Sequence, residues 1–204
     1  MITAPAAQSL GNSGAPADPD GVSDTALMAR VRDGELERLS ELFERHHRRL
    51  FNFFLRLAPG RSAAEDLVQE VFVRMLKYRH TFKSEAEFAP WMFALARNAA
   101  VDQFRSRPRL EVQENPEGPE PVAREAGPAE ELERRERSEL LQAALQRLPR
   151  EKRELLLLAR FGEMKYEAIG ELLGASVGAI KVRVHRALKE LREAYRTVSG
   201  ESLA

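Results

Sequence analysis

The chain has 204 residues, of which 43% are apolar and 31% charged, and its 32 basic side chains balance 32 acidic ones. It has no cysteine, which excludes disulfides and thiolate metal sites. No apolar run approaches the roughly 20 residues that span a bilayer. The first residues lack the basic start and apolar core of a secretory signal, so we expect a cytoplasmic protein without membrane insertion.

The balanced charge conceals segregation along the chain. Residues 24–105 hold 14 basic and 12 acidic side chains, residues 106–139 hold 6 and 10, and residues 149–196 hold 11 and 7. The net charges are therefore +2, −4 and +4. Two mildly basic blocks that flank an acidic stretch indicate separate surfaces for separate partners.

Composition predicts two small domains with a tail at each end. Residues 1–23 are rich in Ala, Gly, Pro and Ser and lack an apolar period, so we expect a disordered tail. Residues 106–129 contain five prolines, which no helix survives. This acidic, Pro-rich segment is predicted to be a flexible linker that spans roughly 25–30 Å. It separates a domain at 24–105 from a domain at 130–197, and residues 198–204 form a C-terminal tail.

The fold class predicted for both domains is all-α, because no stretch alternates apolar and polar residues as a strand does. In the first domain, Ser23 can cap a short helix that carries Leu27 and Val31. A second helix is expected from Glu35 to Ala58.

Two further helices complete the first domain. Residues 62–65 (SAAE) form a capping box that predicts the start of the third helix. The start of the fourth is ambiguous, because Ser84 and Glu87 could form another box while Pro90 suits a first helical turn. This helix is expected to end near Phe104.

The second domain is predicted to contain four helices. The first covers residues 130–148, and the second runs from Pro149 to Phe161. A short helix at 166–173 ends at Gly174, and Ser176 caps the last one.

The last two helices carry the clearest chemical pattern. A short helix, a tight turn with glycine and a cap, and a longer basic helix form the helix-turn-helix pattern, whose second helix fits the major groove. From Val177 to Lys189 inclusive there are four Lys or Arg residues and no acidic one, and Arg and Lys can pair with guanine edges or phosphates. A hairpin with a solvated basic face is the alternative, but the turn, cap and length together favour DNA binding.

Three segments resemble the extracytoplasmic-function (ECF) family of RNA polymerase sigma factors, within the sigma-70 superfamily. Residues Leu148–Glu193 look like sigma region four, and Asp66–Leu76 (DLVQEVFVRML) resembles the polymerase-binding helix of region two. Phe88–Arg105 (FAPWMFALARNAAVDQFR) resembles the promoter-melting segment that follows it. The helix-turn-helix alone is a weak signal, whereas both blocks in this order with an acidic linker between them are a strong one.

The resemblance implies a polymerase-binding face on the third helix. Asp66, Gln69, Glu70 and Arg74 lie near one another at helical spacing, and by analogy they dock on the clamp helices of the beta-prime subunit. Without the resemblance, a solvated polar face would be the better interpretation. The resemblance also implies contact with the beta flap and passage of the acidic linker through a basic channel of the polymerase.

The resemblance further implies that the loop at 82–87 and the polar face of the next helix capture a base of the minus-ten element. Aromatic stacking contributes about 1–3 kcal/mol per base, which offsets part of the cost of unstacking. For Phe88 and Trp91, core packing and DNA contact remain equal alternatives. The implied minus-ten residues are Phe82, Lys83, Phe88, Trp91, Arg97, Asn98, Asp102 and Arg105.

The basic helix is implied to read the minus-thirty-five element. Val182 stands where the family often has a small polar residue, and Leu188 stands where arginine is frequent, which leaves the promoter sequence open. Val182 could instead touch a thymine methyl group. The implied minus-thirty-five residues are Ser176, Lys181, Val182, Arg183, His185 and Arg186.

Other classes of function find less support. The sequence has no glycine-rich phosphate loop, paired-histidine metal motif or nucleophile motif, so we expect no enzyme, no cofactor and no metal. The expected partners are RNA polymerase core, promoter DNA and an anti-sigma protein. The main rival is a stand-alone helix-turn-helix regulator in which residues 24–105 form a sensor or dimerisation domain. A plain helical adaptor would leave the basic helix face unexplained.

Overall fold

The computed structural model describes residues 21–57, 60–106, 128–162 and 164–200, and every regular element in these ranges is a helix. The predicted N-terminal tail, linker and C-terminal tail lie mostly outside the described residues. None of the helices in the described ranges is long and apolar enough to cross a membrane. Because every regular element in the described ranges is a helix, the predicted all-α fold class is confirmed.

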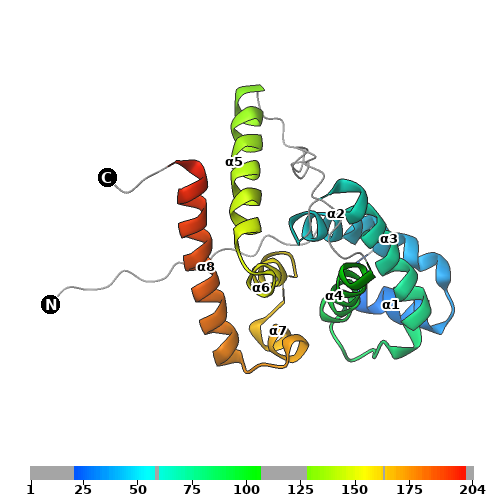
Figure 1. The fold of residues 1–204 in the computed structure, drawn as a ribbon. Helices are drawn as coiled ribbons and strands as arrows, with labels where there is room; N and C mark the ends of the chain where they lie inside the picture. Colours follow the sequence, from blue (N-terminus) through cyan, green and yellow to red (C-terminus); the bar gives the residue numbers. More distant parts are fainter. Residues whose placement is uncertain (1–20, 58–59, 107–127, 163, 201–204) are drawn as a thin grey trace.

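The helices gather into two groups that lie against each other (Figure 1). The first group contains α1 (Asp24–Asp33), the 3-10 helix η1 (Leu36–Arg38), α2 (Leu39–Leu57), α3 (Arg61–Tyr78), the 3-10 helix η2 (Arg79–Thr81) and α4 (Phe88–Ser106). The second contains α5 (Pro128–Arg147), α6 (Arg150–Phe161), α7 (Tyr166–Leu173) and α8 (Val177–Ser199). Helices α6 and α7 face α2 and α4, while α8 lies on the outer side of the second group.

Helix starts and stops follow local chemistry in most places. The Ser23 hydroxyl accepts a hydrogen bond from the backbone N–H of Ala26 at 3.2 Å, as its predicted capping role requires. Gly34 then ends α1 with a φ of 117°, a conformation that disfavours any side chain. The expected single helix from Glu35 is wrong at its start, since η1 precedes α2.

The capping box predicted at residues 62–65 is also wrong. Gly60, with a φ of 117°, occupies the N-cap position, so α3 begins one residue before Ser62. Glu65 instead pairs with Arg61 one turn earlier, with 3.0 Å between Nε and Oε1. Pro90 lies in the first turn of α4, which decides between the two predicted starts of that helix.

Buried aromatic and aliphatic side chains hold the first group together. Phe53 of α2 and Phe93 of α4 meet edge to face, with ring centroids 5.2 Å apart. Each large apolar side chain buried in this way contributes about 1.5–3 kcal/mol. The fully buried large residues of this group are Leu27, Met28, Leu42, Leu50, Phe53, Phe54, Met75, Phe82, Met92 and Phe93.

An ionic cluster fastens α1 to α2 beside this core. The Asp24 carboxylate lies 2.8 Å from Nε2 of the buried His46 and 2.8 Å from Nη1 of Arg45. Burial of the carboxyl opposes its ionisation, but hydrogen bonds and charges from His46 and Arg45 outweigh that effect and lower the pKa of Asp24. The cluster therefore favours the ionised carboxylate.

In the second group, the turn between α7 and α8 is built tightly. Gly174 has a φ of 63° and the Ser176 hydroxyl accepts from the N–H of Ala179 at 3.3 Å, so both predicted boundaries are confirmed. The N–H of Ala175 donates to the carbonyl of Gly170 at 2.8 Å. This bond brings the turn so close to α7 that a Cβ on Gly170 would lie 2.5 Å from the Ala175 carbonyl oxygen.

Replacing Gly170 with alanine is therefore expected to lower the free energy of unfolding by about 1–3 kcal/mol, the usual cost of overpacking. Gly178→Ala is the matched control, because a Cβ there meets nothing within 4 Å. The control substitution should stabilise by up to about 1 kcal/mol through helix propensity. Urea denaturation followed by circular dichroism measures both, and a Gly170→Ala variant as stable as the wild type would contradict the close approach.

Asp24→Asn is expected to destabilise the protein in a pH-dependent manner. Because the folded pKa of Asp24 is lowered, its contribution is present above the unfolded value of about 3.9 and is lost as the pH falls through the folded pKa. The advantage of the wild type over Asp24→Asn should thus be present at about pH 5 and shrink below about pH 4. Urea midpoints across this range measure it, and Glu37→Gln, at an exposed position, controls for the loss of one charge.

Candidate nucleic-acid and protein interfaces

Helix α3 presents the face that was predicted to bind polymerase. Asp66 and Gln69 are exposed, whereas Glu70 and Arg74 are partly buried. Arg74 forms ion pairs with Glu70 at 2.6 Å and with Asp102 of α4 at 2.9 Å. Burial lowers the pKa of Arg74, but the hydrogen bonds that its guanidinium donates to these two carboxylates, together with their negative charges, outweigh burial and raise that pKa overall. The structure thus joins two residues of the predicted polymerase face to one of the predicted minus-ten residues.

Sequence reasoning missed Val73 on the same face of α3. Its side chain is 57% exposed, and it lies three and four residues beyond Glu70 and Gln69, which places it beside them on the helix. An exposed apolar side chain within a polar rim is the usual anatomy of a protein interface. The spacing could have revealed it, because Val73 lies off the buried stripe that includes Val71, Phe72 and Met75.

The aromatic residues near the start of α4 divide into buried and partly buried ones. Phe82 and Phe88 are only 2% and 4% exposed, so in this structure their rings pack the core and offer no face to a base. Trp91 is partly buried, contacts Phe82 with ring centroids 5.2 Å apart, and donates from Nε1 to the Thr81 hydroxyl at 3.3 Å. Through these contacts, Trp91 supports the start of the loop at 82–87.

The polar residues predicted for the minus-ten element have different environments. Lys83, Asn98, Asp102 and Arg105 are exposed. Arg97 instead points to the second group of helices, where its Nε lies 2.7 Å from Oε1 of Glu154 in α6. The structure therefore leaves Lys83, Asn98 and Arg105 exposed, whereas Arg97 and Asp102 take part in ion pairs.

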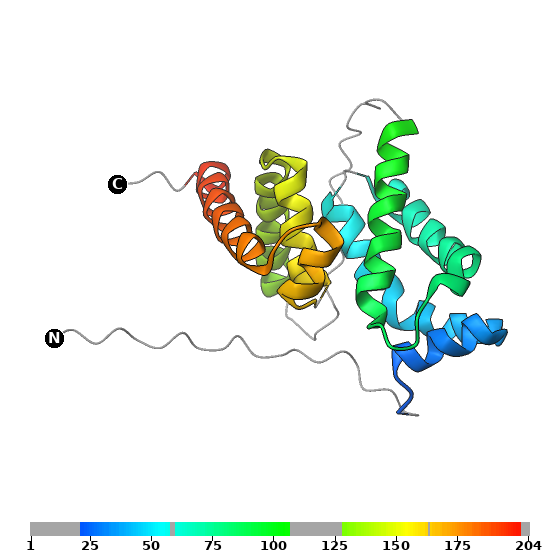
Figure 2. The same ribbon diagram turned by 90° about the horizontal axis from the view of Figure 1, so that it is seen from below.

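Helix α8 separates its core residues from its exposed ones. Ile180, Val184 and Ala187 are buried, while the side chains between them point to solvent. Val182 and Leu188 are 49% and 48% exposed, so the apolar departures from the family pattern lie on the outer surface of the helix. The exposed set includes all six predicted minus-thirty-five residues, Ser176, Lys181, Val182, Arg183, His185 and Arg186. Figure 2 shows that this helix lies at the edge of the molecule, away from α1–α4.

Side chains that sequence reasoning missed connect the two groups of helices. Arg153 of α6 is 9% exposed and donates to the carbonyl oxygen of Leu57 at 2.9 Å. Gln142 of α5 donates to the carbonyl of Leu55 at 3.0 Å. In the opposite direction, Arg49 of α2 donates to the carbonyl of Phe161. Each group thus caps the C-terminal end of a helix in the other, where carbonyl groups lack intrahelical partners.

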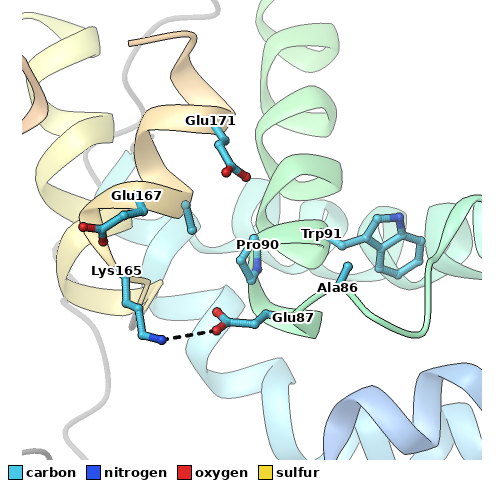
Figure 3. Close-up of a pocket in the computed structure, with 8 residues that line it drawn as sticks. Ala86, Glu87, Pro90, Trp91, Lys165, Glu167 and Glu171 are labelled. Carbon is cyan, nitrogen blue, oxygen red and sulfur yellow. Dashed lines mark ion pairs between the residues drawn. The ribbon is translucent and has the colours of Figure 1, made fainter. Parts of the chain in front are cut away.

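A hollow of about 300 Å³ lies beside this contact, between the start of α4 and α7 (Figure 3). Its lining includes Trp91, Lys165 and three carboxylates, those of Glu87, Glu167 and Glu171. Lys165 reaches across it to Glu87, with 3.6 Å between Nζ and Oε1. Within the described ranges, no group of three or more His, Cys, Asp or Glu side chains is placed to hold a metal ion.

An outward-facing basic helix-turn-helix, together with a separate helical unit whose helix α3 has an exposed polar face, is the arrangement of a transcription initiation factor. A family model described as "Sigma-70 region 2" matches residues 42–110, and one described as "Sigma-70, region 4" matches residues 138–191.

Relatives of known function agree with these matches. The chain is 33% identical over 166 residues to RNA polymerase sigma factor CarQ of Myxococcus xanthus, an alignment that covers 81% of this chain and 94% of CarQ. It is 31% identical over 170 residues to ECF RNA polymerase sigma factor RpoE of Cereibacter sphaeroides, covering 82% of this chain and 92% of the relative.

Solved structures share the fold. The sigma factor RpoE of Bartonella quintana, in complex with the anti-sigma factor NepR, superposes with a TM-score of 0.60 at 25% identity, over 77% of this chain and 96% of that one. CnrH, in complex with the cytosolic domain of CnrY, superposes with a TM-score of 0.64 over 88% of this chain and 99% of that one. At 23% identity, this second likeness shows the fold alone.

The chain belongs to the extracytoplasmic-function family of sigma-70 RNA polymerase sigma factors. It is thus a factor that binds core polymerase, directs it to specific promoters and promotes their opening. The stand-alone regulator considered from the sequence is not favoured.

A double-mutant cycle with Arg74→Ala and Asp102→Asn should show that their ion pair couples α3 to α4. The coupling free energy is expected near about 1 kcal/mol, the upper end for pairs at a surface, because the Arg74 side chain is 18% exposed. The pair Arg137–Glu133, with side chains 70% and 65% exposed, is the control and should give less than about 0.5 kcal/mol. Equal coupling in the two cycles, measured by urea denaturation, would contradict the link.

Proposed function

We propose that this sigma factor engages promoters at two separate points, with α8 on duplex DNA and the α3–α4 unit on polymerase and the opened strand. The observation that carries the proposal is the exposed row on α8, where the predicted contact residues point outward while Ile180, Val184 and Ala187 anchor the helix. A helix held in this way can enter a major groove without disturbing its own core.

Upstream recognition would rest on α8. Lys181, Arg183 and Arg186 are exposed cations that can pair with guanine edges or phosphates. Val182 presents an apolar surface that fits a thymine methyl group. The Ser176 hydroxyl already caps α8. At DNA, Ser176 would therefore act indirectly, because its cap fixes the start of α8 close to a phosphate.

Polymerase docking would rest on the outer face of α3. Asp66 and Gln69 supply exposed polar groups, and Val73 supplies an exposed apolar side chain between them and Lys77. Glu70 and Arg74 form the inner border of this face through their ion pair. We infer that its partner is the clamp-helix region of the beta-prime subunit, as in the family, and that the second domain contacts the beta flap.

Capture of the opened strand would use the loop at 82–87 and the exposed side of α4. Lys83 and Arg105 can hold phosphates, while Asn98 and Asp102 offer hydrogen bonds to a base. Phe82 and Phe88 would act by supporting the loop, because both are buried. Recognition of a flipped base recovers part of the few kcal/mol that unstacking costs.

Several finer features belong to the same proposal. Domains at 24–105 and 130–197 would be joined by the acidic segment between them, which gives the second contact a high effective concentration. The protein would act in the cytoplasm, without catalysing a reaction itself.

An anti-sigma protein would hold it inactive, in line with the relative that was solved together with NepR. Affinity purification from unstressed cells that recovers polymerase subunits and never an inhibitor would count against this partner.

The central test is run-off transcription with purified core polymerase on a genomic promoter library, with and without the protein. Specific transcripts should appear only when the protein is added. Arg186→Ala should weaken transcription from its promoters by about 5- to 150-fold, equivalent to about 1–3 kcal/mol for a base contact. Arg196→Ala removes an exposed cation from the last turn of the same helix and should have little effect.

Charge reversal on the outer face of α3 tests polymerase docking separately from DNA recognition by α8. Asp66→Arg should abolish core binding and transcription while it leaves the fold intact, because Asp66 is exposed. Absence of core binding by the wild-type chain, together with tight footprints by the chain alone, would overturn the proposal in favour of a stand-alone regulator.

A further inference from the structure

The loop at 82–87 is tied to α1, a helix that carries none of the predicted contact residues. Helix α1 contacts η2 and α4, which flank this loop. From its end, Nη1 of Arg32 donates to the hydroxyl of Ser84 at 2.7 Å and to the carbonyl oxygen of Phe82 at 3.4 Å. These partners lie 50 and 52 residues further along the chain, so the contact is a feature of the tertiary fold.

Helix α1 offers a firm support for this contact. Its side chains Leu27, Met28 and Val31 are fully buried, and the ionic cluster around Asp24 fastens its start to α2. Arg32 directly follows Val31. Because close-packed interiors resist displacement, the backbone that carries the Arg32 guanidinium is held in place by the core.

Asp33 orients the guanidinium of Arg32 towards the loop. Its two carboxylate oxygens accept hydrogen bonds from Nε and Nη2 of Arg32, at 2.8 and 3.2 Å. A guanidinium is planar and presents its donors in fixed directions, so the position of two nitrogens defines where the third one points. Asp33 thus holds one edge of the group while Nη1 serves the loop.

The two parts of the loop are held by different means. Phe82, at its start, is 2% exposed and is fixed by packing. The residues from Lys83 to Glu87 are all exposed, and the N–H of Ala86 donates to the carbonyl of Lys83 at 3.0 Å to form a turn. Core packing cannot fix this exposed part, so its position depends on polar contacts.

Ser84 and Glu87 connect the exposed part to other segments of the chain. Glu87 pairs with Lys165 at 3.6 Å, but these side chains are 64% and 77% exposed, and pairs at such exposure add little. The bond from Arg32 to Ser84 is shorter and has a charged donor on a side chain that is only 28% exposed. Charge-assisted hydrogen bonds are the stronger kind, so Arg32 is the main tether of the two.

We propose that Arg32 is a positioning residue for promoter opening, which holds the loop at 82–87 in the shape that receives an unstacked base of the minus-ten element. The inference rests on the proposed strand-capturing role of this loop, because it explains how the same site is kept in place. A loop that is already ordered loses less conformational entropy when it binds. An ordered loop also discriminates better, because a wrong base cannot be accommodated by a shift of the loop.

Base discrimination by the complete complex of core polymerase and sigma factor tests this role. The probes are fluorescent fork-junction DNAs from a promoter found by run-off transcription, with single minus-ten or minus-thirty-five bases exchanged. Arg32→Ala should lower the discrimination at a minus-ten base by about 2- to 12-fold, the range of one hydrogen bond. Discrimination at the minus-thirty-five element and affinity for core should stay unchanged. Loss of folded protein lowers all probe affinities equally and cannot move these ratios.

Two further variants show whether Arg32 acts through the loop. Arg30→Ala removes an exposed cation from the last turn of the same helix and should keep the wild-type discrimination. Ser84→Ala removes the main acceptor of Arg32, so Arg32→Ala should have a smaller effect in that background than in the wild type. Equal effects in both backgrounds would mean that Arg32 touches the DNA directly, contrary to the proposal.

The absence of native cysteine allows the loop to be observed directly. A nitroxide label on Glu85→Cys, in the exposed part of the loop, should become more mobile when Arg32→Ala is added, which the electron resonance line shape reports. A label on Glu44→Cys, at an exposed position of α2, should keep its mobility.

The outcomes separate this role from the function on which it rests. Wild-type discrimination by Arg32→Ala, or unchanged mobility of the label in the loop, would overturn the positioning role and leave the sigma activity standing. A wild-type complex that drives specific transcripts without distinguishing minus-ten bases would remove the base-capturing role of the loop along with that of Arg32. If the wild type drives no specific transcript, the sigma function and this role fall together.

Discussion

The buried guanidinium of Arg153 is the interaction on which the arrangement of the whole molecule depends. It satisfies carbonyl groups at the ends of two helices from different domains, where the backbone has no partners of its own. Leaving such a group buried without its partners costs about 3–5 kcal/mol, so the positions of α2, α5 and α6 are mutually constrained. Glu154, Gln142 and Arg49 then add contacts around a centre that is already fixed.

Sequence reasoning succeeded where structure is decided by neighbouring residues. The boundaries of α7 and the cap of α8 depend on Gly174 and Ser176, whose effects reach only three or four residues along the chain. The capping box at residues 62–65 failed for a related reason. Serine with glutamate three residues later suits a helix start, but Gly60 offers a positive φ just before it and begins α3 earlier.

The contacts between domains could not be predicted in this way. Arg153 and its acceptor Leu57 are 96 residues apart, and the residues between them include the segment predicted to be a linker. In the sequence, Arg153 and Glu154 look like ordinary polar residues of an amphipathic helix. Similarly, aromatic composition near α4 suited both DNA stacking and core packing, and only the three-dimensional positions of Phe82 and Phe88 show that both are buried.

The division of α8 into a buried and an exposed side has a consequence for how this protein could diversify. Ile180, Val184 and Ala187 support the domain, while Lys181, Val182, His185 and Arg186 face outward at intervening positions. If α8 reads DNA as proposed, exchange of the outer set alters which DNA sequence is preferred and leaves the buried side unchanged. Duplicated copies of such a factor can therefore acquire separate sets of target genes through a few surface substitutions, without first having to re-evolve a stable domain.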